Sequence, residues 1–149
     1  MMLKHEKGFT LIELLIVVAI IGIIAAIAVP NLLTAIQRSK RSRSAADMRA
    51  IGTALGSYNV DANIYPIKAD TNFSAIAFQA SMAAGMPSSY YEGAAKDGWG
   101  KDLRYSSDGQ GYTLTSYGKD QASGGGTDFD SDVIYINGQF QGPSTLVKK

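Results

Sequence analysis

One segment near the C-terminus combines residue types that could bind a metal ion. Residues 116–132 contain four glycines and four aspartates, and the aspartates are Asp120, Asp128, Asp130 and Asp132. Carboxylates this close together repel one another unless water or a cation screens them, and Ca²⁺ prefers about six to eight hard oxygen ligands. In extended backbone, the alternating side chains of the last three aspartates would point the same way. The segment therefore predicts a calcium site, with a solvated, flexible acidic loop as the alternative.

A second carboxylate, Glu13, stands at the start of a long apolar run. The 24 residues from Leu14 to Gln37 carry no charge. A carboxylate within hydrocarbon costs roughly 2.5 kcal/mol or more, so such residues tend to be paired and functional. Because no basic residue follows within one turn, we expect its partner to be a lipid headgroup, a free α-amine or another subunit. The alternative is that Glu13 marks the interfacial end of the helix.

The composition excludes several kinds of site. The chain has 149 residues, 14 Lys and Arg against 13 Asp and Glu, no cysteine and one histidine, His5. There can be no disulfide framework, Cys-based zinc site or thiol nucleophile. A formal net charge of +1 also argues against nucleic-acid binding, which needs a basic face.

The apolar run is long enough to cross a bilayer as a helix, since about 20 apolar residues suffice. It is too long for a secretory signal peptide, and no small-residue cleavage site closes it. Basic residues flank it on both sides: Lys4 and Lys7 before it, and Arg38, Lys40, Arg41 and Arg43 after it. The later cluster predicts a collar that contacts lipid headgroups, with salt bridges to a neighbouring head as the alternative. Counted alone, these charges would place the head in the cytoplasm.

Beyond the run, apolar residues narrow to one helical face. Met48, Ile51, Leu55 and Tyr58 follow at spacings of three, four and three residues. The pattern predicts one helix from about Leu11 to about Val60, whose second half packs on a head. Within it, Pro30 removes a backbone donor and should bend or loosen the helix.

The remaining residues, 61–149, predict a small head. Two hairpins are indicated, one joining 103–106 to 112–116 and one joining 133–136 to 139–141 through Asn137-Gly138. A loop and a short helix are expected in residues 70–92, and the apolar side of that helix is Phe73, Ile76, Ala77 and Met82. The predicted fold class is α+β, a long N-terminal helix packed on a small antiparallel sheet.

The run Lys7-Gly8-Phe9-Thr10-Leu11-Ile12-Glu13-Leu14 resembles the processing signal of the type IV pilin and pseudopilin superfamily. The likeness continues through Gly22 and Val29-Pro30-Asn31. It implies that a prepilin peptidase cuts between Gly8 and Phe9 on the cytoplasmic face and that Phe9 is N-methylated. It further implies that Glu13 meets the Phe9 amine of a neighbouring subunit, that the segment between Gly22 and Pro30 unfolds when subunits pack in a filament, and that the head faces the periplasm.

A narrower likeness covers the head. Tyr58-x-x-Asp61-x-x-x-Tyr65-Pro66, then Asp97-x-Trp99-Gly100, then residues 116–132 follow the order seen in major pseudopilins of type II secretion systems. In that family the last loop binds calcium. The resemblance therefore implies side-chain ligands from the four loop aspartates, Asp120, Asp128, Asp130 and Asp132, and a backbone oxygen at Ser116.

These interpretations divide the chain into four parts. Residues 1–8 are a leader, 9–36 a transmembrane and filament-core helix, 37–60 its amphipathic half, and 61–149 the head. Without the leader the chain keeps twelve basic and twelve acidic residues and no histidine, so no enzyme activity is expected.

The function hypothesis is a structural subunit of a pilus-like helical filament, foremost the major pseudopilin of a type II secretion system. The alternatives are a major or minor type IV pilin of an extracellular adhesion or motility pilus, and a monomeric membrane-anchored calcium-binding module. Expected partners are copies of the chain, the bacterial inner membrane, prepilin peptidase, minor pilins or pseudopilins and an assembly platform, but no nucleic acid. Assembly would move the chain from the inner membrane to a periplasmic or extracellular filament.

Overall fold

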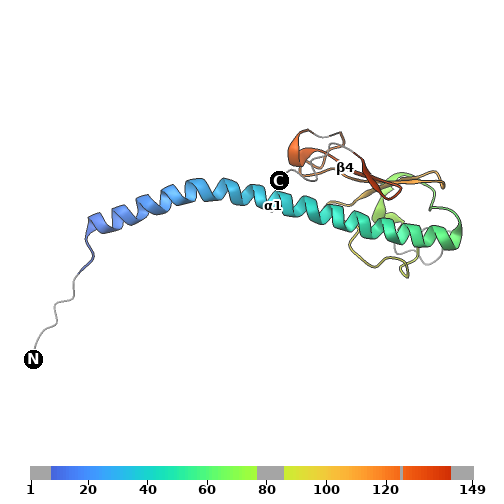
Figure 1. The fold of residues 1–149 in the computed structure, drawn as a ribbon, viewed down its shortest axis with the longest axis horizontal. Coiled ribbons are helices and arrows are strands. Elements are labelled where there is room, and N and C mark those ends of the chain that lie inside the picture. The colour runs from blue at the N-terminus through green and yellow to red at the C-terminus, as the bar shows by residue number, and fades with distance from the viewer. Residues whose placement is uncertain (1–7, 77–85, 125, 142–149) are drawn as a thin grey trace, which may run out of the picture. The chain divides into compact units, whose positions relative to one another are not determined.

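The computed structural model describes residues 8–76, 86–124 and 126–141. The chain divides into two compact units, Met1–Ile36 and Gln37–Lys149. One helix, α1, runs through both, and all the strands belong to the second unit (Figure 1).

Helix α1 spans Leu11–Ala62, two residues beyond the expected end. Its first half is apolar on every face, and Pro30 lies inside it without ending it. The helix stops where Asn63 adopts a left-handed conformation at φ +55°, while the Asn63 N–H still donates to the Asn59 carbonyl at 2.7 Å. Asparagine tolerates this conformation and commonly ends helices in this way.

The head contains one antiparallel sheet whose five strands pair in chain order, β1-β2-β3-β4-β5. Their bounds are Lys68–Asn72, Arg104–Ser107, Tyr112–Ser116, Val133–Ile136 and Gln139–Gln141. Asn137 and Gly138 both have positive φ, +47° and +90°, as a tight turn between β4 and β5 requires. Both predicted hairpins are confirmed, as is the α+β fold class.

Two features of the head differ from expectation. Strand β1 was not predicted, and it pairs with β2 through an irregular register. Among the described residues of this region, the expected short helix corresponds to one 3₁₀ turn, Phe73–Ala75, whose Phe73 side chain is fully buried. The proposed apolar positions Ala77 and Met82 lie outside the described residues.

The core forms between the second half of α1 and the sheet. All four residues of the predicted helix face, Met48, Ile51, Leu55 and Tyr58, are at most 3% exposed. They join a cluster with strand residues, among them Tyr105 and Leu114. Figure 1 shows the strands beside this half of the helix. The amphipathic pattern therefore identified the packed face correctly.

Gly52 allows the sheet to approach the helix closely. A Cβ at this position would lie 2.5 Å from a ring carbon of Tyr135 and 2.7 Å from the hydroxyl of Tyr112. Both distances are shorter than side chains tolerate, and the rings belong to packed strands. A glycine costs a helix about 1 kcal/mol relative to alanine, so the close packing outweighs helix propensity here.

Replacing Gly52 with alanine should lower the stability of the head by up to about 2 kcal/mol, because overpacking costs about 1–3 kcal/mol and helix propensity returns about 1. Gly56→Ala is the matched control, since a Cβ there meets nothing within 4 Å, and it should raise stability by up to about 1 kcal/mol. Thermal unfolding of the detergent-solubilised chain, followed by circular dichroism, measures both. Equal stability of the two variants would show that the sheet does not press on Gly52.

Candidate functional site

The junction between Gly8 and Phe9 precedes the helix. Gly8 is exposed, and Phe9 is 75% exposed. A Cβ on Gly8 would meet nothing within 4 Å. Within the described residues, no part of the fold therefore shields the peptide bond at which cleavage is expected.

Glu13 caps the start of its own helix. The Thr10 N–H and the Thr10 hydroxyl donate to Glu13 Oε2 at 2.8 and 2.7 Å, and the Glu13 N–H donates to the Thr10 hydroxyl at 3.3 Å. This is a capping box, in which a Thr and a Glu three residues later satisfy backbone donors that the first helical turn leaves unpaired. A Thr three residues before a Glu at the start of an apolar run is the sequence signal of such a box.

The capping box corrects one expectation in part. The sequence suggested that Glu13 needs a partner from elsewhere, whereas the structure supplies two neutral donors from the same chain. Both donors converge on Oε2, and among the described residues none donates to Oε1. The carboxylate is thus held in a fixed direction, while its charge stays uncompensated by any cation of the described chain.

Among the described residues, none buries the large apolar side chains of the segment from Leu11 to Ile36. From Leu11 to Ile36, its large apolar side chains are 41–76% exposed. The most apolar 18 residues of α1 have a mean hydropathy of 3.1, so by length and composition this one described helix could cross a membrane. Gly22 and Pro30 lie within it, and the Asn31 side-chain amide donates to the Ile27 carbonyl at 3.1 Å just after the proline. The predicted unfolding between Gly22 and Pro30 concerns an assembled filament and stays a prediction.

The acidic loop, residues 117–132, folds back on itself between β3 and β4. The Lys119 N–H donates to the Phe129 carbonyl at 2.8 Å. Gly118 is buried at φ +70°, and a Cβ there would lie 2.7 Å from the same carbonyl oxygen. Only glycine fits this crossing of the two loop arms.

The extended backbone expected for Asp128, Asp130 and Asp132 is wrong. Asp128–Asp130 forms a 3₁₀ turn, and Asp128 has φ +56°. Among the described residues, no group of three or more His, Cys, Asp or Glu side chains is positioned to hold a metal. Alternation along an extended strand therefore does not bring these carboxylates together.

The loop nevertheless contains one carboxylate oxygen that fits a cation. Asp132 Oδ2 accepts a hydrogen bond from the Gly124 N–H at 2.9 Å, whereas Asp132 Oδ1 is buried and has no hydrogen-bond partner. Asp120 Oδ1 accepts from the Ala122 N–H at 3.1 Å. The other two proposed aspartates are exposed at Asp128 and half-buried at Asp130. An unpaired buried carboxylate oxygen is costly unless something binds it, so the donor chemistry at Asp132 suits calcium.

A buried carboxylate that the sequence did not single out as functional lies behind this loop. Asp97 is 5% exposed. Its Oδ1 accepts from the Trp99 and Lys101 N–H groups at 3.0 and 2.9 Å, and its Oδ2 accepts from the Ser116 hydroxyl at 2.8 Å. Asp97 thereby ties the 97–101 turn to Ser116, the last residue before the loop.

The same turn is docked on α1. The Gly98 N–H donates to the Ser44 hydroxyl at 2.8 Å, and the Trp99 indole N–H donates to the Gln37 side-chain oxygen at 2.8 Å. A Cβ on Gly98 would lie 2.0 Å from the Lys40 carbonyl oxygen. Glycine is therefore the only residue that lets the turn contact the helix backbone.

Arg41 reaches the other side of the loop from the same helix. It is 6% exposed, and its guanidinium donates to the Asp128 carbonyl and, at 3.0 Å, to the Ser131 hydroxyl. Burial lowers the pKa of Arg41, and the nearby Asp128 charge partly opposes that shift. The expectation that Arg41 belongs to an exposed basic collar is therefore wrong. Its charge is directed into the head, where it orders the 3₁₀ turn.

Two family models match the chain. The model described as type II secretion system protein G matches residues 31–135, and the model described as the prokaryotic N-terminal methylation motif matches residues 3–29. Together they cover the apolar segment and nearly all of the described head.

Curated relatives agree with the first model. The chain is 32% identical over 136 residues to a type II secretion system core protein G of Vibrio cholerae, covering 85% of this chain and 91% of that one. It is 30% identical to the protein of the same name from Pseudomonas aeruginosa, covering 87% and 94%. The type IV major pilin protein PilA of Myxococcus xanthus is 54% identical over 54 residues, which are 24% of that protein. No solved structure shows significant similarity.

Replacing Arg41 with methionine should release the acidic loop. Two charge-assisted hydrogen bonds are lost, but a buried charge is removed as well, so the global stability should change little. Locally, amide hydrogen exchange in residues 118–131 should accelerate by about tenfold or more, which is about 1.4 kcal/mol of lost protection. Mass-spectrometric exchange on the detergent-solubilised chain measures this.

Arg38→Met is the control for Arg41→Met, because Arg38 is exposed on the same helix and should leave loop exchange unchanged. Unaltered exchange in the Arg41 variant would mean that the loop is ordered without the helix.

Proposed function

Because the chain belongs to the family of type II secretion system protein G, we propose that it is the major pseudopilin of such a system. In this role it is a structural subunit of a pilus-like helical filament. The observation that carries the proposal is an apolar helical segment without any protein covering, joined to a folded head. Such a segment needs lipid before assembly and copies of itself afterwards.

An extracellular type IV pilin is the less favoured function. The similarity to the Myxococcus xanthus pilin covers 36% of this chain, whereas the protein G relatives from Vibrio cholerae and Pseudomonas aeruginosa match over 85% and 87% of it. The monomeric calcium-binding module is also less favoured, because it would need neither the Gly8-Phe9 junction nor Glu13. We propose no catalytic role, since the chain after Gly8 contains neither histidine nor cysteine.

The proposed pathway begins with hydrolysis of the Gly8–Phe9 bond by a prepilin peptidase at the cytoplasmic face of the inner membrane. This leaves Phe9 as the N-terminal residue, which is then N-methylated, and places the head in the periplasm. The exposure of the junction and the match to the N-terminal methylation motif support this step. Minor pseudopilins and an assembly platform are the further partners proposed for filament growth.

In the filament, the Phe9 amine of one subunit would pair with the Glu13 carboxylate of a neighbour. The capping box supports this pairing, because it fixes Oε2 on Thr10 and leaves Oε1 to accept another donor. Within a hydrocarbon-like filament core, an unpaired carboxylate is strongly unfavourable. Addition of a subunit to the filament would therefore be most favourable when its Glu13 carboxylate is paired with a Phe9 amine.

We also propose that the acidic loop binds calcium. The proposed ligands are Asp120, Asp128, Asp130, Asp132 and the Ser116 backbone oxygen, and the buried unpaired Oδ1 of Asp132 is the observation that supports the group. A bound calcium ion would neutralise the loop carboxylates and cross-link the two loop arms.

Glu13→Gln separates charge pairing from helix capping. The amide oxygen can still accept from Thr10, but the charge is gone, so we expect filament yield to fall by about tenfold or more. Electron microscopy and the sheared filament fraction of cells expressing the variant give the yield, and peptidase cleavage should continue. Thr10→Val is the complementary control, since it weakens the cap and keeps the charge, and should assemble better than Glu13→Gln. Normal filaments from Glu13→Gln would exclude the proposed ion pair, and a wild-type chain that forms none would exclude the function.

Removal of calcium should destabilise the head. At a calcium concentration about 100 times the Kd, binding adds about 2.7 kcal/mol, which corresponds to a Tm decrease of roughly 10 °C on addition of chelator. Asp132→Asn should abolish this response. Asp108→Asn should retain it, because Asp108 lies in the β2–β3 turn, where it accepts from the Gln110 and Gly111 N–H groups. A Tm that ignores chelator in the wild type would contradict the calcium proposal.

A further inference from the structure

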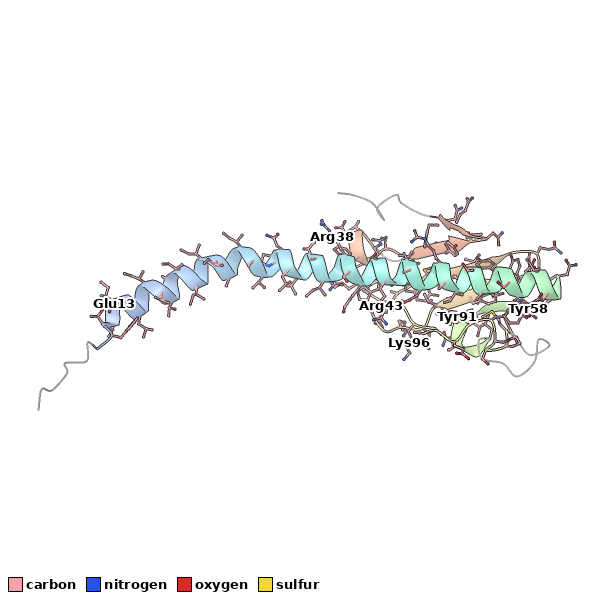
Figure 2. All side chains as sticks on the ribbon, turned by 60° about the horizontal axis from the view of Figure 1, so that its bottom comes forward. Glu13, Arg38, Arg43, Tyr58, Tyr91 and Lys96 are labelled. Atoms are coloured by element: carbon pink, nitrogen blue, oxygen red, sulfur yellow. The ribbon has the colours of Figure 1, made fainter. Side chains whose placement is uncertain are left out.

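Two separate parts of the chain bring basic side chains to one level of α1. The helix contributes Arg38, Lys40 and Arg43, and the 97–101 turn with its flanks contributes Lys96 and Lys101. All are exposed except Lys40, which is half-buried. In Figure 2, Arg38 and Arg43 leave the helix on different sides, and Lys96 lies on the side of Arg43. From here on the name collar is used for these five residues and Trp99, and it no longer includes the buried Arg41.

The 97–101 turn is fixed to the helix, so the lysines beside the turn stay next to the basic residues of α1. Gly98 contacts the Lys40 carbonyl and the Ser44 hydroxyl, as described above. Trp99 is half-buried, and its indole N–H is held by Gln37 at 2.8 Å. The sequence showed only the helical half of this basic surface, because the other half joins it through contacts 54 to 62 residues apart.

The collar keeps a net positive charge. Within the described residues, the only ion pair that it makes joins Arg43 Nε to Asp47 at 3.7 Å, and the Arg43 side chain remains 71% exposed. Asp97 lies between the two lysines in sequence, but its carboxylate is buried and accepts three hydrogen bonds inside the head. Apart from Arg43, the cations make no ion pair among the described residues and are available to a partner, and the Asp97 carboxylate is directed into the head.

The position of the collar along the chain indicates which partner it fits. Gln37 and Arg38 directly follow Ile36, the last large residue of the exposed apolar segment. Tryptophan and lysine or arginine at the end of a membrane-length helix are typical of the bilayer interface, where long basic side chains extend to lipid phosphates. An acidic loop of a neighbouring subunit could pair with the cations, but such pairing would leave the Trp99 indole beside Gln37 without a role.

We propose that the collar binds anionic phospholipid headgroups at the membrane face from which the head emerges. It holds the unassembled subunit at a defined depth, with the 97–101 turn against the headgroups. The inference rests on the proposed membrane insertion of the apolar segment and adds to it a lipid-binding surface on the head. Attraction between exposed cations and anionic lipid weakens as salt screens it.

Trp99 is the only tryptophan of the chain and reports directly on the collar. The full chain is reconstituted into phosphatidylcholine vesicles, with or without phosphatidylglycerol, that contain a headgroup spin-labelled lipid as quencher. Phosphatidylglycerol should increase Trp99 quenching about twofold at low salt, and this gain should vanish near 1 M salt, where the Debye length is about 3 Å. Wild-type quenching that ignores phosphatidylglycerol would overturn the proposal.

Charge reversal identifies the residues responsible. The double variant Lys96→Glu, Lys101→Glu should lose the phosphatidylglycerol response, and Lys68→Glu, Lys119→Glu, which makes the same charge change at exposed positions elsewhere in the head, should keep it. Circular dichroism checks that both remain folded. A collar variant that retains the lipid response overturns the proposal. If that variant also loses filaments, the collar contacts a neighbouring subunit instead of lipid.

Vesicle flotation of the wild type tests insertion by itself. A chain that does not float with the vesicles contradicts the membrane insertion on which the proposed function depends. A chain that floats but shows no phosphatidylglycerol response contradicts only the proposal that the collar binds anionic lipid.

Discussion

The apolar segment between Leu11 and Ile36 cannot remain in water, and the rest of the molecule follows from that constraint. Sixteen large apolar side chains are exposed along it in the single chain. Covering them is worth on the order of 20 kcal/mol, more than the roughly 5–15 kcal/mol that stabilises a typical folded domain. Lipid or copies of the same segment must therefore surround it. The Glu13 carboxylate stands at the start of this segment, and basic residues follow directly at its end.

Helix α1 changes its role after Ile36. From Gln37 onward one face packs against protein, and three of its polar residues at helical spacing, Gln37, Arg41 and Ser44, each hold part of the head. Gln37 and Ser44 fix the 97–101 turn, whereas Arg41 fixes the acidic loop. The loop and the basic surface are therefore positioned by the same short stretch of helix. A conformational change in that stretch of helix would therefore move both the acidic loop and the basic surface.

The sequence predicted the elements that local chemistry determines. The helix follows from apolar periodicity, and the β4–β5 hairpin from Asn137-Gly138, whose residues adopt the positive φ that a tight turn needs. Strand β1 was missed because Lys68–Asn72 contains almost no β-forming residues and lies exposed at the sheet edge. The 3₁₀ turn at Asp128 and the burial of Arg41 were missed for one shared reason. Each depends on the other across 87 residues, and a charged side chain is expected outside unless such a partner is known.

The strand order has a consequence for how the head is built. Each strand pairs with the one synthesised just before it, in the order β1-β2-β3-β4-β5, and α1 precedes them all. As the chain emerges during synthesis, each strand after β1 finds its neighbour already present. Nearby pairing of this kind favours fast folding and limits the time for which sticky strand edges are available to other chains. The strand order thereby lowers the risk that the head aggregates before it has folded.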